Sequence, residues 1–285
     1  MRPFRLALLT ALALVAFAGN SLLARVALRD AGIDAASFTA LRIASGALAL
    51  WLIVRLRGAA VAGSGSWGSA LALFAYAAAF SFAYLSLTAA TGALLLFGAV
   101  QVTMIGAGLA RGERLGGAQW LGLLLASGGL VGLLLPGLSA PPLAGALLMI
   151  AAGIAWGAYS LRGRTPTGAG DPTTVTAGNF IRASPLALAL VAVAALLAPL
   201  HADPAGAGYA LASGALTSGL GYAIWYTALK GLHATSAATV QLSVSVLTAL
   251  AGVLLLSEPV TPRLLLASAA VLGGIALVIF VRRPR

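Results

Sequence analysis

The sequence contains no cysteine, only two histidines and only six acidic residues in 285 positions. Without thiols, no disulfide framework, thiolate metal site or cysteine nucleophile can form. His201 and His233 fall in different predicted loops, so we expect no metal cluster. The connections between apolar runs are too short for a soluble domain, and the runs hold no paired acid and base, so we expect no cofactor and no enzyme activity, including that of a membrane enzyme acting on lipids. Charged residues make up 8% of the chain, against about 25% in a typical soluble domain. The chain therefore lacks the polar surface that water requires.

Long apolar runs fill the sequence instead. Apolar residues make up 61% of the chain, and the mean hydropathy is +1.03. A helix that crosses the hydrocarbon core of a bilayer needs about 20 such residues. The first run imitates a signal peptide, but it continues through Leu22-Leu23-Ala24 and predicts an uncleaved helix. We predict an all-α polytopic membrane bundle of ten transmembrane helices, at residues 5–25, 36–55, 68–87, 91–110, 117–135, 142–161, 175–198, 206–229, 235–256 and 263–281.

The net charge of +11 does not indicate a nucleic-acid partner, because the basic residues stand singly or in pairs between apolar runs and not on one face. Their distribution instead predicts orientation through the positive-inside rule. With the N-terminus in the cytoplasm, only Arg25, Arg29 and Arg263 fall in outside loops. The inside segments carry Arg2, Arg5, Arg55, Arg57, Arg111, Arg114, Arg162, Arg164, Lys230, Arg282, Arg283 and Arg285. Both termini are therefore predicted to be cytoplasmic.

The two halves of the chain, residues 1–140 and 141–285, resemble each other. Leu41-Arg42-Ile43-Ala44-Ser45 corresponds to Ile181-Arg182-Ala183-Ser184, and Ala16-Phe17-Ala18-Gly19-Asn20-Ser21 lies over Ala155-Trp156-Gly157-Ala158-Tyr159-Ser160. Thr103 and Glu113 correspond to Thr248 and Glu258. Because each half holds five predicted helices, an odd number, the halves should be inverted across the membrane. Inverted repeats are a recurrent transporter architecture, although duplication without transport remains an alternative.

On these residues the chain resembles a known family over its whole length. The five-plus-five arrangement, Gly112-Glu113-Arg114, Ser257-Glu258-Pro259 and Trp156-Gly157 resemble the EamA-type drug/metabolite transporter superfamily. Within that superfamily, the chain is similar to the YddG-type aromatic amino acid exporters. The resemblance implies a cavity lined by the first, third, fourth, sixth, eighth and ninth spans. It also implies outward movement of small metabolites across a bacterial inner membrane.

Polar and aromatic side chains at helical spacing on these spans are the candidate substrate-binding residues. Uncompensated polar groups in hydrocarbon cost roughly 2–7 kcal/mol, so they should face the interior. Aromatic residues near span ends could instead form an interfacial belt or core packing, and the amides could join helices by hydrogen bonds. The candidates are Phe17, Asn20, Tyr76, Phe80, Tyr84, Phe97, Gln101, Trp156, Tyr159, Tyr222, Tyr226, Gln241 and Ser245.

Two arginines lie within predicted spans, where a charge is a functional candidate by default. The topology places Arg42 near Glu258 at the outer surface and Arg182 near Glu113 at the inner surface. We predict that each pair is a gate or brace that alternates with conformational state. Snorkelling of the two arginines to the interface is the alternative.

None of the six acids is predicted near the bilayer midplane, where proton or sodium coupling usually places a carboxylate. We therefore predict a facilitator or exchanger whose binding groups are uncharged. A strongly anionic substrate would find no basic group at the centre, so a neutral or zwitterionic aromatic solute fits best, with aromatic amino acids leading. The alternatives are an exporter of aromatic or quaternary cationic drugs and a non-transporting receptor or scaffold. The expected partners are a small-molecule substrate and the lipid bilayer.

Overall fold

The fold is an all-helical bundle, seen in a computed structural model that describes residues 3–30, 32–112, 114–137, 140–164, 171–229, 231–232 and 234–280. Within these ranges there is no β-strand, only an isolated bridge between Ile33 and Ala202. The helices are α1 (Pro3–Arg29), α2 (Ala35–Leu56), α3 (Trp67–Tyr84), α4 (Ala89–Ala110), α5 (Gly117–Leu134), α6 (Leu143–Arg164), α7 (Pro172–Leu197), α8 (Pro204–Ala212), the π-helix η1 (Ser213–Leu220), α9 (Gly221–Leu229), α10 (Ala234–Leu256) and α11 (Pro262–Phe280).

Seven helices, α1 to α7, are long and apolar enough to cross a membrane. The segments α8, η1 and α9 follow one another without a break and make one continuous helical segment, here called a rod, from Pro204 to Leu229. In α10 and α11, the described apolar stretches Ser243–Leu256 and Pro262–Val278 are shorter. The chain is thus a multi-pass membrane protein, and the count of ten spans stays a prediction for the last three rods.

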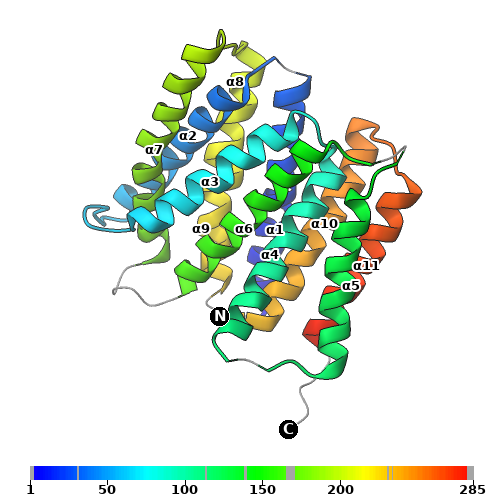
Figure 1. The fold of residues 1–285 in the computed structure, drawn as a ribbon. Helices are drawn as coiled ribbons and strands as arrows, with labels where there is room; N and C mark the ends of the chain where they lie inside the picture. Colours follow the sequence, from blue (N-terminus) through cyan, green and yellow to red (C-terminus); the bar gives the residue numbers. More distant parts are fainter. Residues whose placement is uncertain are drawn as a thin grey trace.

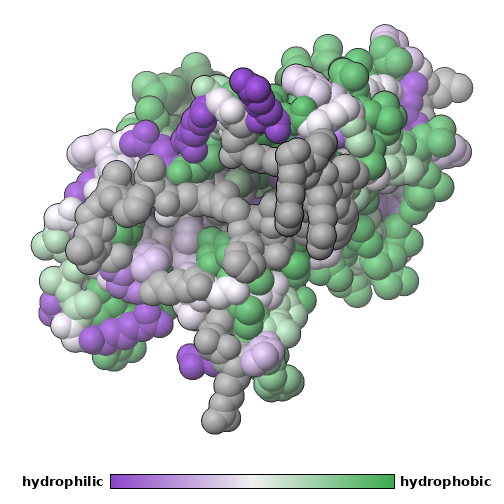
Figure 2. Space-filling model, turned by 90° about the horizontal axis from the view of Figure 1, so that it is seen from below, coloured by the Kyte–Doolittle hydropathy of each residue, from purple (hydrophilic) through white to green (hydrophobic). Residues whose placement is uncertain are grey.

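The outside of the bundle is apolar, as a lipid environment requires. Large hydrophobic side chains such as Leu124, Leu188, Leu254 and Leu266 are exposed along the helices. Figure 2 views the bundle from the end at which α1 begins, and hydrophobic residues (green) cover the right-hand flank while hydrophilic residues (purple) are scattered over the end. In Figure 1, α1 begins and α11 ends at this same lower end. The side of the membrane that this end faces stays a prediction.

The contacts between helices follow a paired pattern. Helix α2 packs on α7, and α5 packs on α11. The contact between α3 and α6 corresponds to the contacts that α1 makes with α8 and α9. The contact between α4 and α6 corresponds to the contact between α1 and α10. Likewise, α3 meets α7 as α2 meets η1. Each of these named contacts maps on its counterpart when the five helical segments of one half are exchanged for the five of the other. The repeat and its inverted orientation remain predictions.

Short polar residues begin several helices by accepting hydrogen bonds from backbone N–H groups that have no partner inside the helix. The carboxylate of Asp34 accepts from the backbone N–H of Ser37 at 2.8 Å and from that of His201 at 2.9 Å. Partial burial raises the pKa of the Asp34 carboxyl, but these hydrogen bonds outweigh it and hold the pKa below its usual value. Asp34 thereby joins the start of α2 to the segment before α8.

Candidate functional site

A small enclosed pocket lies at the centre of the bundle, between α1, α3, α4, α6 and α9. Its free space is about 10 Å³, so side chains nearly fill it. The lining residues are Phe17, Asn20, Ser21, Tyr76, Phe80, Leu96, Phe97, Trp156 and Tyr222. Seven of these are among the thirteen candidates from the sequence, and all are buried. The structure thus brings together groups that are far apart in the chain.

Aromatic rings make most of the pocket wall, and Trp156 is their common contact. Its ring lies 4.9 Å from Tyr76 and 4.9 Å from Tyr222, centroid to centroid, and 6.3 Å from Phe17. Phe17 also contacts Tyr222 edge to face at 5.8 Å. Offset and edge-to-face pairs of this kind are the favoured arrangements of aromatic rings. They form an apolar wall that fits another ring.

Asn20 supplies the main polar group of the pocket and joins three elements. Its Oδ1 accepts hydrogen bonds from the hydroxyls of Ser213 at 2.7 Å and Thr217 at 3.2 Å, both on η1. Its Nδ2 donates to the hydroxyl of Tyr76 on α3 at 3.3 Å. Asn20 therefore lines the cavity and also joins helices by hydrogen bonds, which are the two alternatives that the sequence left open.

The π-helix η1 presents its hydroxyls to this polar network. A π-helical turn is rare and is frequently found at functional sites. Ser213 and Thr217 bond Asn20, and Ser218 accepts a hydrogen bond from Nε of Arg42 at 3.1 Å. These three residues are not among the candidates predicted from the sequence. The hydroxyls of Ser213 and Thr217, four residues apart in a glycine-rich span, were a signal that could have identified two of them. Sequence analysis also missed Ser21 and Leu96 as lining residues.

The other candidates are buried or partly buried outside the lining. Tyr159 stacks on Trp156 at 5.5 Å and accepts a hydrogen bond from Nδ2 of Asn179 at 3.3 Å. Tyr84 packs edge to face on Phe80 at 4.8 Å; it is fully buried, so the alternative that it belongs to an interfacial belt is wrong. The candidates on α4, α9 and α10 that do not line the pocket are Gln101, Tyr226, Gln241 and Ser245.

The predicted pairing of Arg42 with Glu258 is wrong in this conformation. Glu258 accepts a hydrogen bond from Nε of Arg25 at 2.9 Å, and both side chains are buried. The sequence predicts Arg25 in an outside loop, but α1 continues to Arg29, and Arg25 is buried in the bundle. The carboxylate of Glu258 also accepts from the backbone N–H of Ala89, where α4 begins.

Arg42 instead lies beside the central pocket. Its Nη2 donates to the hydroxyl of Tyr76 at 2.9 Å, and its Cζ is 4.8 Å from the ring centroid of Phe80. Tyr76 and Phe80 both line the pocket. The expectation that no basic group lies near the centre is therefore wrong, because the long side chain reaches inward from α2.

Arg182, the predicted repeat counterpart of Arg42, has different surroundings. Its Nη1 donates to the carbonyls of Ser64 and Gly178. Arg182 also lines a cleft of about 580 Å³ with Trp51 and Arg55. Its predicted partner Glu113 lies outside the described residues, so the second gate pair stays a prediction.

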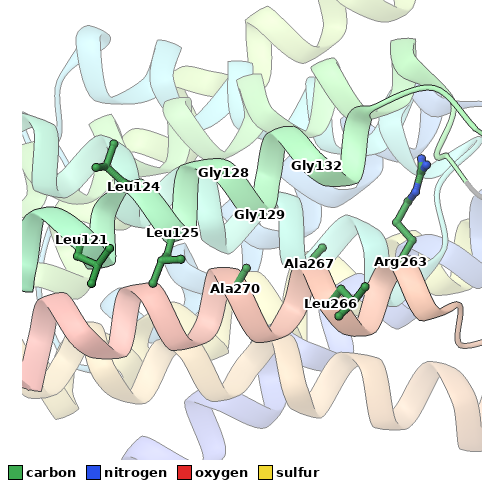
Figure 3. A pocket seen from close by; sticks show the side chains of 10 residues that line it. All are labelled: Leu121, Leu124, Leu125, Gly128, Gly129, Gly132, Arg263, Leu266, Ala267 and Ala270. Carbon is green, nitrogen blue, oxygen red and sulfur yellow. The ribbon is translucent and has the colours of Figure 1, made fainter.

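A third cavity is a groove of about 620 Å³ on the outside of α5 and α11. Figure 3 shows leucines from both helices along this groove, three glycines on α5, and Arg263 at one end. Leu124 and Leu266 are largely exposed, and Arg263 bonds the carbonyls of Leu135 and Pro136. This groove is an apolar surface suited to lipid chains, whereas the central pocket combines buried polar and aromatic groups.

Comparison with known proteins agrees with this architecture. Residues 143–280 match the EamA-like transporter family. The chain is 62% identical over 282 residues to the uncharacterized protein PA1977 of Pseudomonas aeruginosa. The aligned region covers 99% of this chain and 96% of that protein. A crystal structure of a protein that is 20% identical has a TM-score of 0.65 and covers 96% of each chain, which shows a shared fold. Residues 143–280, just under half of the chain, therefore form an EamA-like transporter domain, which agrees with a multi-pass membrane protein.

Proposed function

We propose that the chain exports small, largely apolar metabolites, with aromatic amino acids as the leading class, across a bacterial inner membrane by alternating access. The observation that carries this proposal is the central pocket. Rings from α1, α3, α4, α6 and α9 surround the amide of Asn20 and the hydroxyl of Ser21. An aromatic side chain can pack on the rings while its polar end bonds the polar groups.

The small free volume of the pocket supports a mechanism with more than one conformation. About 10 Å³ is too small for an amino acid, because a single water molecule already needs roughly 10–15 Å³ of such space. A solute can enter only if the helices around the pocket move apart. We propose that the two repeats, with their paired contacts, rock against each other and open the pocket to one side at a time.

We further propose that transport is not driven by a carboxylate in the pocket. None of the acids in the described ranges lines it. Glu258 is buried, but its oxygens are engaged by Arg25 and by the backbone of Ala89. A facilitator or exchanger that moves solute down its own gradient fits this arrangement.

The test is flux of labelled tryptophan and phenylalanine from liposomes that contain the purified protein. We expect flux well above that of empty liposomes, with little dependence on a proton gradient. Trp156→Ala should lower the rate at least about 10-fold, because stacking pairs contribute about 0.5–1.5 kcal/mol each and Trp156 makes several. Trp120→Ala is the matched control, since Trp120 is exposed on α5, and its flux should equal that of the wild type.

The same liposomes separate the rival functions. Flux of a quaternary aromatic cation without flux of either amino acid would favour a cationic drug exporter. If no solute moves faster than through empty liposomes, the transport proposal is wrong and a receptor or scaffold would remain.

A further inference from the structure

Arg42 is a buried cation that has no acidic partner among the residues that the structure describes. Its side chain is 2% exposed. Nε donates to Ser218 at 3.1 Å and Nη2 to the Tyr76 hydroxyl at 2.9 Å, both neutral oxygens. Nη1 is buried and makes no hydrogen bond within the described structure. Two of the three nitrogens are thus held in place and the third is left free.

The described acids do not supply the missing charge. The salt bridges among the described residues join Arg25 to Glu258, Arg29 to Asp30 and Arg57 to Asp171. Arginine cannot release its proton in a protein, so Arg42 stays charged in an apolar bundle. A buried charge without a partner costs several kcal/mol. Such a cost is expected where the partner is a ligand that arrives from outside.

The position of Arg42 indicates which ligand this is. Its Cζ lies 5.0 Å from the Tyr76 ring centroid and 4.8 Å from that of Phe80, and both rings line the central pocket. Asn20 bonds the same Tyr76 hydroxyl from the pocket side. Tyr76 therefore links the guanidinium to the pocket, since its hydroxyl bonds both Arg42 and Asn20. A planar guanidinium matches a carboxylate, which can accept two parallel hydrogen bonds from it.

We propose that Arg42 binds the carboxylate of the transported solute, and that the substrates are aromatic carboxylates, zwitterionic amino acids among them. This inference rests on the proposed transport function and narrows its substrate class. Aromatic rings on one side and a guanidinium on the other select a solute that carries a ring and a carboxylate. They disfavour a cation, which would be repelled by Arg42.

Ligand pairs that differ only at the carboxylate test the proposal without any mutation. We would measure binding of tryptophan and of tryptophanamide to the purified wild type in nanodiscs by calorimetry. Hydrogen bonds to a charged group contribute about 1.5–3 kcal/mol, so tryptophan should bind about 10- to 150-fold more tightly. Equal affinities would overturn the role of Arg42 and leave the transport proposal standing. Failure of both compounds to bind would overturn both proposals.

Variants then assign the preference to one residue. Arg42→Gln should lose the preference for tryptophan and keep its affinity for tryptophanamide within about 3-fold, and Arg42→Lys should restore part of the preference. Tyr76→Phe, which removes the hydroxyl but keeps the charge, should retain the preference. Arg182→Gln, at the repeat-equivalent position, should retain it fully. If Arg42→Gln elutes as a folded protein and still prefers tryptophan, the proposal is wrong; if it does not fold, Arg42→Lys and Tyr76→Phe decide the question.

Discussion

Replacement of Glu258 by alanine should lower the free energy of unfolding by about 3–5 kcal/mol, the usual cost of removing one partner from a buried ion pair. The carboxylate accepts from Nε of Arg25 at 2.9 Å and from the backbone N–H of Ala89 at 2.8 Å. One side chain therefore joins α1, the start of α4 and the segment after α10. Its loss leaves Arg25 charged and buried, and among the described residues its remaining hydrogen bond is the one to the carbonyl of Tyr84 at 3.5 Å.

Thermal unfolding of the purified protein in micelles measures this effect. The matched control is Asp30→Ala, because the Arg29–Asp30 pair is exposed, with side chains 57% and 59% accessible and a separation of 3.8 Å. Exposed pairs contribute about 0–1 kcal/mol, so this control should unfold close to the wild type. A Glu258→Ala protein that is as stable as the Asp30→Ala protein would contradict the structural role of the buried pair.

The second large effect is expected at Gly214, where α2 and η1 approach most closely. A methyl group at this position would overlap the backbone carbonyl of Arg42 and the hydroxyl of Ser45. The carbonyl belongs to a helix and cannot yield like a flexible side chain. Gly214→Ala should therefore destabilise the protein by about 3 kcal/mol, the upper end of the cost of overpacking. It should also displace Arg42 from its position beside the pocket and weaken tryptophan binding.

Gly208→Ala is the control for this substitution, on the same rod but with no atom within 4 Å of the added methyl group. Alanine is favoured over glycine in a helix by about 1 kcal/mol, so this variant should be as stable as the wild type or slightly more so. Thermal unfolding and gel filtration of both variants provide the measurement. If Gly214→Ala behaves like Gly208→Ala, the close packing of α2 on η1 is wrong.

The sequence predicted the helical class well because composition alone dictates it. A chain with 8% charged residues must place apolar side chains outward, and the runs between charged residues have the length of a membrane helix. Helical spacing also identified much of the pocket. Tyr76 and Phe80 are four residues apart and share one face of α3, and both line the cavity.

The sequence did not predict the charge pairs, because an arginine side chain reaches about one helical turn and its partner depends on how helices pack. The prediction placed Arg25 in a loop, whereas one extra turn of α1 carries it to Glu258. In the register that places Ala16 over Ala155, Arg25 corresponds to Arg164. The Arg164 side chain and Glu113 lie outside the described structure, so an alternating counterpart of the Arg25–Glu258 pair remains a hypothesis.

The π-helical segment was equally out of reach of sequence analysis. Residues 213–220 were predicted to be an ordinary part of one span, and periodicity alone does not reveal the wider winding. This winding accompanies the placement of the Ser213 and Thr217 hydroxyls on Asn20 and of the Ser218 hydroxyl on Arg42. The hydrogen bonds of Asn20 and Arg42 to η1 thus depend on a π-helix that residue composition and spacing do not predict.

Thiol labelling of Ser21→Cys tests the central claim most directly, since the chain has no cysteine of its own and Ser21 lines the pocket. A membrane-impermeant reagent would be added to one side or the other of oriented membrane vesicles, with and without tryptophan. The account predicts labelling from both sides, slowed by tryptophan, while Val15→Cys, which points outward from the same helix, shows no effect of tryptophan. Labelling of Ser21→Cys from one side only, or at a rate that tryptophan does not change, would contradict an alternating pocket that holds the solute.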